Sequence, residues 1–191
     1  MSEEFSIYLI RHGEATGGWD QDMDPGLSAL GQQQARDVAQ KLAPLGPLPV
    51  ITSPMRRTQE TAAAFTGLWG NEAIIDQRVS EVPSPTDDLD VRREWLMQMM
   101  PGKWSDPVAQ RAGPHDLAVW RRELVDAVTS LTEPTVITSH FVAINVLVGH
   151  IMGDDSVVCF RPDNCSVTEI ISTGGDLRVS SLGHEAETEV G

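Results

Sequence analysis

Short apolar runs alternate along this chain with longer segments in which apolar residues recur at helical spacing. The short runs predict strands at residues 5–10, 49–52, 73–79 and 135–138. The amphipathic segments predict helices at residues 30–42, 54–65, 87–100, 117–131 and 141–152. Two further predicted strands, 166–172 and 177–182, flank Thr173-Gly174-Gly175-Asp176, which is typical of a hairpin turn.

Strands that alternate with helices are typical of an α/β protein. We therefore predict a three-layer αβα sandwich with a mostly parallel central sheet and an antiparallel edge strand from the final hairpin. The chain has no internal repeat and no long linker, so we expect a single domain over residues 1–191, with a frayed acidic tail at 184–191. Segments 82–90 and 101–114 predict loops that flank a helix roofing a ligand site.

Charge and composition narrow the classes of partner. The 191 residues include 28 acidic and 14 basic side chains, a net charge of −14, which disfavours binding to nucleic acids and to anionic membranes. The N-terminal residues do not resemble a signal peptide and no apolar run is long enough to span a bilayer, so we expect a cytoplasmic protein. Two cysteines without a C-x-x-C pair predict neither a disulfide framework nor a zinc site. The sequence leaves the oligomeric state open.

Chemically versatile residues follow three of the predicted strands. Arg11-His12-Gly13-Glu14 follows the first strand, Ser53 and Arg57 follow the second, and His140 follows the strand at 135–138. Each piece alone has an ordinary structural explanation, such as a surface ion pair or a packed core histidine. Ligands of open α/β sheets bind beyond the carboxyl ends of strands. If these strands are neighbours, two imidazoles and two guanidiniums meet in one crevice, which predicts a site for an anion such as phosphate.

The same pieces resemble a known family. Ile10-Arg11-His12-Gly13-Glu14 matches the R-H-G-E signature of the histidine phosphatase superfamily, also called phosphoglycerate mutase-like. The segments 24–35 and 53–62 resemble the two stretches that follow in that family, although Thr58 and Glu60 replace its usual Ala and Gln. His140 stands at the family's second catalytic histidine, with Phe141 in place of the usual Gly. The resemblance extends from about residue 6 to residue 172.

The resemblance implies a mechanism without metal or cofactor. Neutral His12 attacks the phosphorus of a small phosphorylated substrate and forms a phosphohistidine, with its other ring nitrogen held by a carbonyl such as that of Gly13. Arg11, Arg57 and His140 stabilise the phosphoryl oxygens. Glu81, which follows the third predicted strand, is the expected general acid. Asp87 or Asp88 is the alternative acid, and a structural pair between Glu81 and Arg78 is the alternative role for Glu81. Expected phosphate or substrate contacts are Gly13, Glu14, Ser53 and Asn164.

Several functions stay open at this stage. We favour a phosphomonoester hydrolase over a mutase, because the family's mutases are longer chains and the tail here is short and acidic. A non-catalytic phosphate-binding module is a further alternative. A zinc enzyme is disfavoured, because H-x-E occurs without P-C-x-x-C and H-E-x-x-H is missing. The predicted roof, which we expect to select the substrate, carries Arg92, Arg93, Lys103, Arg111 and His115.

Overall fold

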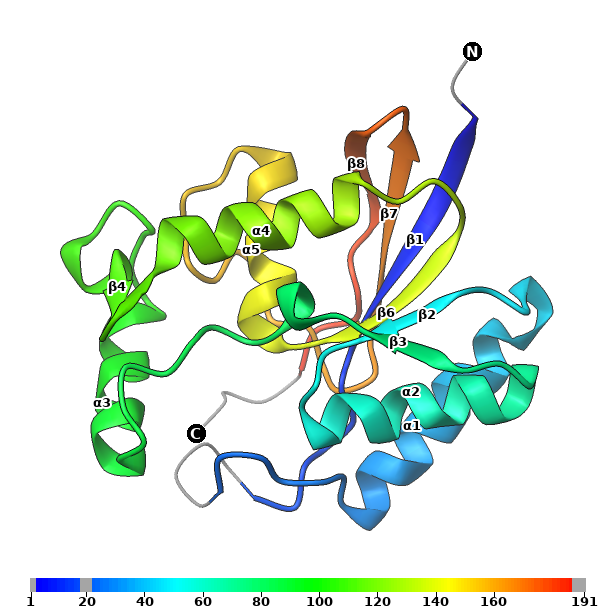
Figure 1. Ribbon diagram of the computed structural model, residues 1–191, viewed down its shortest axis with the longest axis horizontal. Coiled ribbons are helices and arrows are strands. Elements are labelled where there is room, and N and C mark those ends of the chain that lie inside the picture. Colours follow the sequence, from blue (N-terminus) through cyan, green and yellow to red (C-terminus); the bar gives the residue numbers. More distant parts are fainter. Residues whose placement is uncertain (1–2, 18–21, 187–191) are drawn as a thin grey trace.

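The computed structural model describes residues 3–17 and 22–186 and is built on a six-stranded sheet with the strand order β3-β2-β6-β1-β7-β8 (Figure 1). The strands of this sheet are β1 (Glu4–Arg11), β2 (Val50–Thr52), β3 (Ala73–Ile75), β6 (Thr135–Ser139), β7 (Val167–Thr173) and β8 (Asp176–Ser181). Strands β3, β2, β6 and β1 run parallel to one another, whereas β7 is antiparallel to both β1 and β8. The predicted mostly parallel sheet with an antiparallel final hairpin is confirmed, with β8 as the edge strand.

Helices cover both faces of this sheet. They are α1 (Ala29–Leu42), α2 (Arg56–Trp69), α3 (Leu89–Met99), α4 (Leu117–Thr129) and α5 (Phe141–Met152). Helices α1 and α2 lie together on one face and α4 and α5 on the other (Figure 1). Within β1, Leu9 packs toward the α4–α5 side and Ile10 toward the α1–α2 side, as the alternation of side chains along a strand requires. The three-layer architecture is therefore confirmed.

The third predicted strand is shorter than its sequence suggests. Strand β3 ends at Ile75, and residues Gln77–Val79 form a short 3-10 helix, η2. The Asp76 carboxylate accepts a hydrogen bond from the Arg78 backbone N–H at 2.9 Å, which turns the chain out of the sheet. The prediction of a strand through residue 79 is wrong for this reason.

The connections between these elements include two other 3-10 turns, η1 (Ala43–Leu45) and η3 (Pro107–Ala109), and a two-stranded ribbon of β4 (Arg111–Ala112) and β5 (His115–Asp116). The ribbon lies near α3 at the periphery of the molecule (Figure 1). Within residues 3–17 and 22–186, no helix has the length and apolar content needed to cross a membrane.

The segment predicted to fray begins with ordered contacts. The Asp163 backbone N–H donates to the His184 carbonyl at 2.8 Å, and the Ala186 N–H donates to the Arg161 carbonyl at 3.2 Å. These bonds fasten residues 184–186 to the loop that precedes β7. Residues 187–191 lie outside the described part of the chain.

Candidate active site

The register of the sheet brings three of the candidate segments together. Arg11 at the end of β1 pairs with Ser139 at the end of β6, and Thr52 at the end of β2 pairs with Thr138. The next residues along these strands are His12, His140 and Ser53. The centroids of the two imidazole rings are 5.4 Å apart, in an edge-to-face arrangement.

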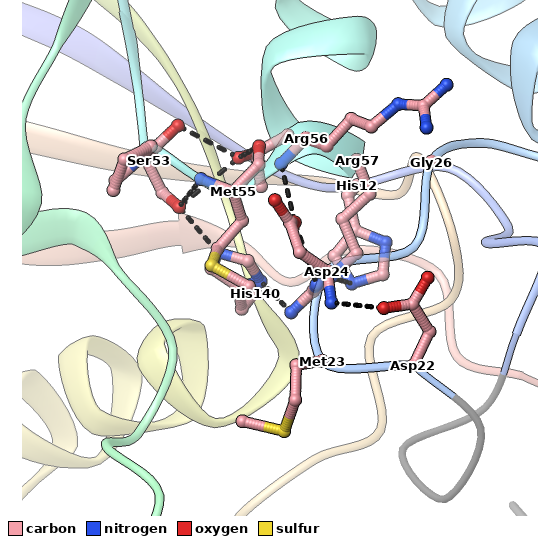
Figure 2. Close-up of polar contacts among 12 residues, drawn as sticks. His12, Asp22, Met23, Asp24, Gly26, Ser53, Met55, Arg56, Arg57 and His140 are labelled. Atoms are coloured by element: carbon pink, nitrogen blue, oxygen red, sulfur yellow. Dashed lines mark hydrogen bonds and ion pairs between the residues drawn. The ribbon is translucent and has the colours of Figure 1, made fainter. Parts of the chain in front are cut away.

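Arg57 joins the two imidazoles. It lies in the first turn of α2, and only 3% of its surface is exposed. Its Nε donates to His12 Nε2 and its Nη2 to His140 Nδ1, both at 3.2 Å. Figure 2 shows these three side chains with Asp24 beside them. The ends of β1, β2 and β6 therefore lie together as predicted, and the Arg57 guanidinium lies between the two imidazoles.

The hydrogen bonds of His12 assign its tautomer. Its Nδ1 lies 2.8 Å from the Gly13 carbonyl oxygen, which only accepts, so Nδ1 carries the proton. Nε2 accepts from Arg57 and keeps the lone pair. Burial lowers the pKa of His12 well below 6.5, and the positive charges of Arg57 and Arg11 lower it further. His12 is therefore a neutral imidazole with its lone pair on Nε2.

His140 has the opposite tautomer. Because Arg57 only donates, His140 Nδ1 is an acceptor, and its Nε2–H donates to Ser53 Oγ at 2.8 Å. Burial is the main reason why the pKa of His140 also lies well below 6.5, followed by the charge of Arg57. Ser53 therefore orients His140 so that Nδ1 is directed toward Arg57.

Arg11 contributes a second guanidinium at the end of β1. Its Nη1 donates to the Pro162 carbonyl at 2.9 Å, and the group lies 5.2 Å from the centroid of the Phe141 ring. Its Nε is buried without a hydrogen-bond partner among the described residues. Buried donors are usually satisfied, so this N–H is a spare donor on a guanidinium whose charge lowers the pKa of both His12 and His140.

Glu81 faces the same cluster from the segment after η2. Its carboxylate accepts from the backbone N–H groups of Val82, Val142 and Ala143 at 3.0, 3.3 and 3.1 Å. Burial raises the pKa of Glu81 despite these donors and the charge of Arg57, which both lower it. A buried carboxyl whose pKa is raised can hold a proton for transfer.

The alternatives weighed against Glu81 are placed elsewhere. Asp87 and Asp88 are exposed, and Asp88 caps α3 by accepting from the Asp90 and Val91 N–H groups. Arg78 pairs with Asp76 at 2.6 Å rather than with Glu81.

Comparison with known proteins agrees with this geometry. A sequence model described as histidine phosphatase superfamily (branch 1) matches residues 7–185. The chain belongs to the histidine phosphatase superfamily. A protein of Erwinia tasmaniensis named as a probable phosphoglycerate mutase is 30% identical over 181 residues, which cover 86% of this chain and 83% of the relative.

Solved structures of this superfamily share the fold. A mycobacterial glucosyl-3-phosphoglycerate phosphatase superposes with a TM-score of 0.70 at 21% identity, over 96% of this chain and all of the other. A phosphoserine phosphatase from Entamoeba histolytica superposes with a TM-score of 0.72 at 19% identity, over 93% and 95% of the two chains. The named relatives thus include both phosphatases and a mutase.

Three predicted phosphate or substrate contacts have structural partners in this member of the superfamily. The Gly13 N–H donates to Thr61 Oγ1 at 3.1 Å, and Asn164 Nδ2 donates to the His12 carbonyl at 2.9 Å, so both hold the His12 backbone. The exposed Glu14 carboxylate accepts from Ser28 Oγ at 2.7 Å and is turned toward the start of α1. Ser53, the fourth, reaches the cluster through His140.

Two residues near the cluster were not singled out from the sequence as part of it. Asp24 accepts from the Arg56 N–H at 2.8 Å and lies 3.8 Å from Arg57 Nη1. Arg92, named only as a roof residue, is 5% exposed. Its position four residues before Leu96 and seven before Met99 puts it on the apolar face of α3, and that spacing was a signal that it would be buried.

The described part of the chain holds no group of three or more His, Cys, Asp or Glu side chains that could bind a metal ion. The charged groups that act on His12 are the guanidiniums of Arg57 and Arg11. The chemistry available to this arrangement is therefore nucleophilic attack by an imidazole, stabilisation of anionic oxygens and proton transfer by Glu81.

Proposed function

We propose that this protein is a phosphomonoester hydrolase that works through a phosphohistidine on His12 and needs no metal. The observation that carries the proposal is the tautomer of His12. The Gly13 carbonyl fixes the proton on Nδ1, and burial with two neighbouring guanidiniums keeps the ring neutral, so that the Nε2 lone pair is available. A neutral imidazole with a fixed tautomer is what an attack on phosphorus requires.

In the first step, the phosphate takes over hydrogen bonds that the side chains now make with each other. Arg57 transfers its donors from the imidazoles to phosphoryl oxygens, and the unpaired Nε of Arg11 supplies another donor. His12 Nε2 then forms a bond to phosphorus as the ester P–O bond breaks. The protonated Glu81 carboxyl gives its proton to the departing alkoxide, which leaves as an alcohol.

In the second step, water replaces the alcohol. The Glu81 carboxylate accepts a proton from the water, the water oxygen bonds to phosphorus, and the P–Nε2 bond breaks. Inorganic phosphate leaves and His12 is neutral again. The negative phosphate also raises the pKa of His140, so that its Nδ1 can gain a proton and donate to a phosphoryl oxygen.

The first experiment measures hydrolysis of p-nitrophenyl phosphate by the wild type, His12→Ala and His150→Ala. His150 lies exposed in the last turn of α5 and is the matched control. We expect His12→Ala to abolish turnover, His150→Ala to retain it, and a chelator to leave the wild-type rate unchanged. A wild-type mixture quenched in alkali should carry an acid-labile phosphoryl group on His12. Full activity of a folded His12→Ala variant would overturn the proposal.

Phosphoryl transfer between positions of a phosphoglycerate is the second candidate, because the Erwinia relative is named as a probable phosphoglycerate mutase. A mutase returns the phosphoryl group from the histidine to a bound acceptor, whereas a hydrolase passes it to water. Phosphoglycerate is therefore incubated with and without a bisphosphorylated primer, and both free phosphate and isomerised ester are measured. We expect free phosphate as the main product. Isomerisation that outpaces phosphate release would favour the mutase.

A further inference from the structure

Thr58 carries a buried hydroxyl that the proposed reaction does not use. It lies in the first turn of α2, beside Arg57, and none of its surface is exposed. Its Oγ1 lies 2.7 Å from the Met55 carbonyl oxygen, 3.1 Å from the Ser53 carbonyl oxygen and 3.2 Å from Ser53 Oγ. Ser53 Oγ also accepts the hydrogen bond from His140 Nε2 (Figure 2). Thr58 is therefore separated from the His140 imidazole by one side chain.

The hydrogen bonds of Ser53 determine where its own proton points. A hydroxyl group has one proton to donate and two lone pairs that accept. Ser53 Oγ accepts from His140 Nε2–H at 2.8 Å and from the Met55 backbone N–H at 3.2 Å, so both lone pairs are engaged. Among the described residues, Thr58 Oγ1 is the remaining acceptor within reach of that proton. Ser53 therefore donates to Thr58, and Thr58 donates to the Met55 carbonyl, its shortest contact.

The direction of these hydrogen bonds bears on how His140 binds phosphate, because its Nδ1 can present an N–H in two ways. Either the ring gains a second proton and becomes a cation, or the ring stays neutral and its one proton is on Nδ1 instead of Nε2. The neutral form requires Ser53 to turn its hydroxyl and donate to Nε2. That rotation breaks the bond from Ser53 to Thr58, and Thr58 can replace it only by giving up its shorter bond to Met55. A hydrogen bond lost in a buried site is costly.

The charges around His140 oppose a cation in the free protein and favour it once phosphate is bound. Burial lowers the pKa of His140 most, and four neighbouring basic groups lower it further: Arg57, His12, Arg11 and Arg92. A phosphate dianion next to Nδ1 acts in the opposite direction and favours uptake of a proton. Charge alone does not decide which ring nitrogen keeps the first proton, whereas the hydrogen bonds of Ser53 and Thr58 do.

We propose that Thr58 is a positioning residue that, through Ser53, keeps a proton on Nε2 of His140, so that His140 binds the phosphoryl group as an imidazolium ion. The second proton, on Nδ1, is taken from solvent when the dianion binds. A charged donor forms a stronger hydrogen bond to an anionic oxygen than a neutral N–H does. This inference rests on the proposed reaction of His12 and gives a function to a hydroxyl that does not contact the substrate.

Nitrogen NMR of the imidazole rings tests the protonation state, because a ring nitrogen with a proton and one with a lone pair resonate far apart. Wild type, Thr58→Val and Thr58→Ser with isotopically labelled histidine are compared at neutral pH, without and with saturating inorganic phosphate, and His140→Asn identifies the signals. With phosphate, we expect protons on both nitrogens of His140 in the wild type and Thr58→Ser, and on Nδ1 alone in Thr58→Val. Two protons in Thr58→Val, or one in the wild type, would overturn the inference. Thr58→Ala takes the place of Thr58→Val if the bulkier residue prevents folding.

Hydrolysis of p-nitrophenyl phosphate measures what the charge contributes. Thr58→Val should lower kcat/KM about ten-fold, the difference between a neutral and a charge-assisted hydrogen bond, and Thr58→Ser should restore it. Thr135→Val is the matched control, because the Thr135 hydroxyl is also buried and donates to the Glu133 carbonyl at 2.9 Å, at the other end of β6 from His140. We expect Thr135→Val to keep the wild-type value. An equal loss in Thr135→Val, or no recovery in Thr58→Ser, would indicate that Thr58 has only a structural role.

The role of Thr58 and the hydrolase proposal fail in different ways. The NMR comparison uses inorganic phosphate and needs no turnover, so it tests Thr58 independently of the reaction. If a folded His12→Ala variant keeps full activity, the hydrolase proposal is wrong. If His12→Ala abolishes turnover but His140 binds phosphate with two protons in Thr58→Val, only the role of Thr58 is wrong.

Discussion

Replacing Gly31 with alanine should destabilise the protein, although alanine is the better helix former. Gly31 lies in the first turn of α1, against the turn that follows His12. A Cβ atom at this position would lie 2.0 Å from the Glu14 carbonyl oxygen and 2.8 Å from its backbone nitrogen. Both atoms belong to the backbone, so no change of rotamer can relieve the clash, and the helix or the turn has to move.

The size of the effect follows from two opposing terms. Overpacking of this kind costs about 1–3 kcal/mol, and the absence of a yielding side chain favours the upper end. The higher helix propensity of alanine than of glycine offsets about 1 kcal/mol of this cost. The net loss is about 2 kcal/mol, which lowers Tm by about 4–8 °C in a chain of this length. Moving the turn also displaces His12, two residues before Glu14, and kcat should fall about ten-fold or more.

Gly67 provides the control within the same protein. It lies in α2, is exposed, and an added Cβ would meet nothing within 4 Å. Gly67→Ala should therefore gain the helix propensity, raise Tm by about 2–4 °C and leave kcat unchanged. Thermal unfolding by circular dichroism and hydrolysis of p-nitrophenyl phosphate give both readouts. If Gly31→Ala were as stable as Gly67→Ala, the argument from the close approach of the two backbones would be refuted.

Three further predictions concern the buried titratable groups. Glu81→Gln should slow hydrolysis of alkyl phosphates about 100-fold more than hydrolysis of p-nitrophenyl phosphate, whose leaving group needs no proton. In the wild type, hydrolysis of alkyl phosphates should persist until pH rises through the raised pKa of Glu81. Equal losses on both substrates would remove Glu81 as the acid. Ser53→Ala leaves the Nε2–H of His140 without its acceptor and should cost about 1–3 kcal/mol in urea unfolding; an unchanged midpoint would contradict this. The folded-state pKa values of His12 and His140 lie below 6.5, so their contribution to the free energy of unfolding is present above pH 6.5 and is lost as pH falls through the folded-state values. His140→Asn should therefore lose less stability between pH 7.5 and 5.5 than His150→Asn. An equal loss in both variants would contradict this prediction.

Regular elements were predictable where one local signal dominates. The apolar run at 141–152 predicted the bounds of α5, because Gly153 ends the helix in the left-handed conformation that glycine adopts without strain. The end of β3 could not be predicted in the same way. Residues 73–79 have a strand-like composition, and the capping of Arg78 by the Asp76 side chain decides the outcome.

Side-chain direction at the site was less predictable than the meeting of the strand ends. His12, Arg57 and His140 come together because strand order and register determine where strand ends meet. Glu14 belongs to the same motif as His12, yet its carboxylate bonds Ser28 on a segment that only the tertiary fold brings near. The spacing along α3 predicts that Arg92 is buried, but its contact with Met23 depends on how the tertiary fold brings that segment to α3.

The proposed reaction uses Glu81 as acid in the first step and as base in the second, and its position in the fold is suited to both roles. Strand β6 and helix α5 are separated by His140 alone, so the imidazole and the N–H groups of Val142 and Ala143 that bind Glu81 lie on one turn of the chain. Burial and the charge of a bound phosphate favour the protonated carboxyl that the leaving group needs. The N–H donors favour the carboxylate that remains after the alcohol has left. Because burial and these donors act on the pKa of Glu81 in opposite directions, the same carboxyl can give up a proton in the first proposed step and take one from water in the second.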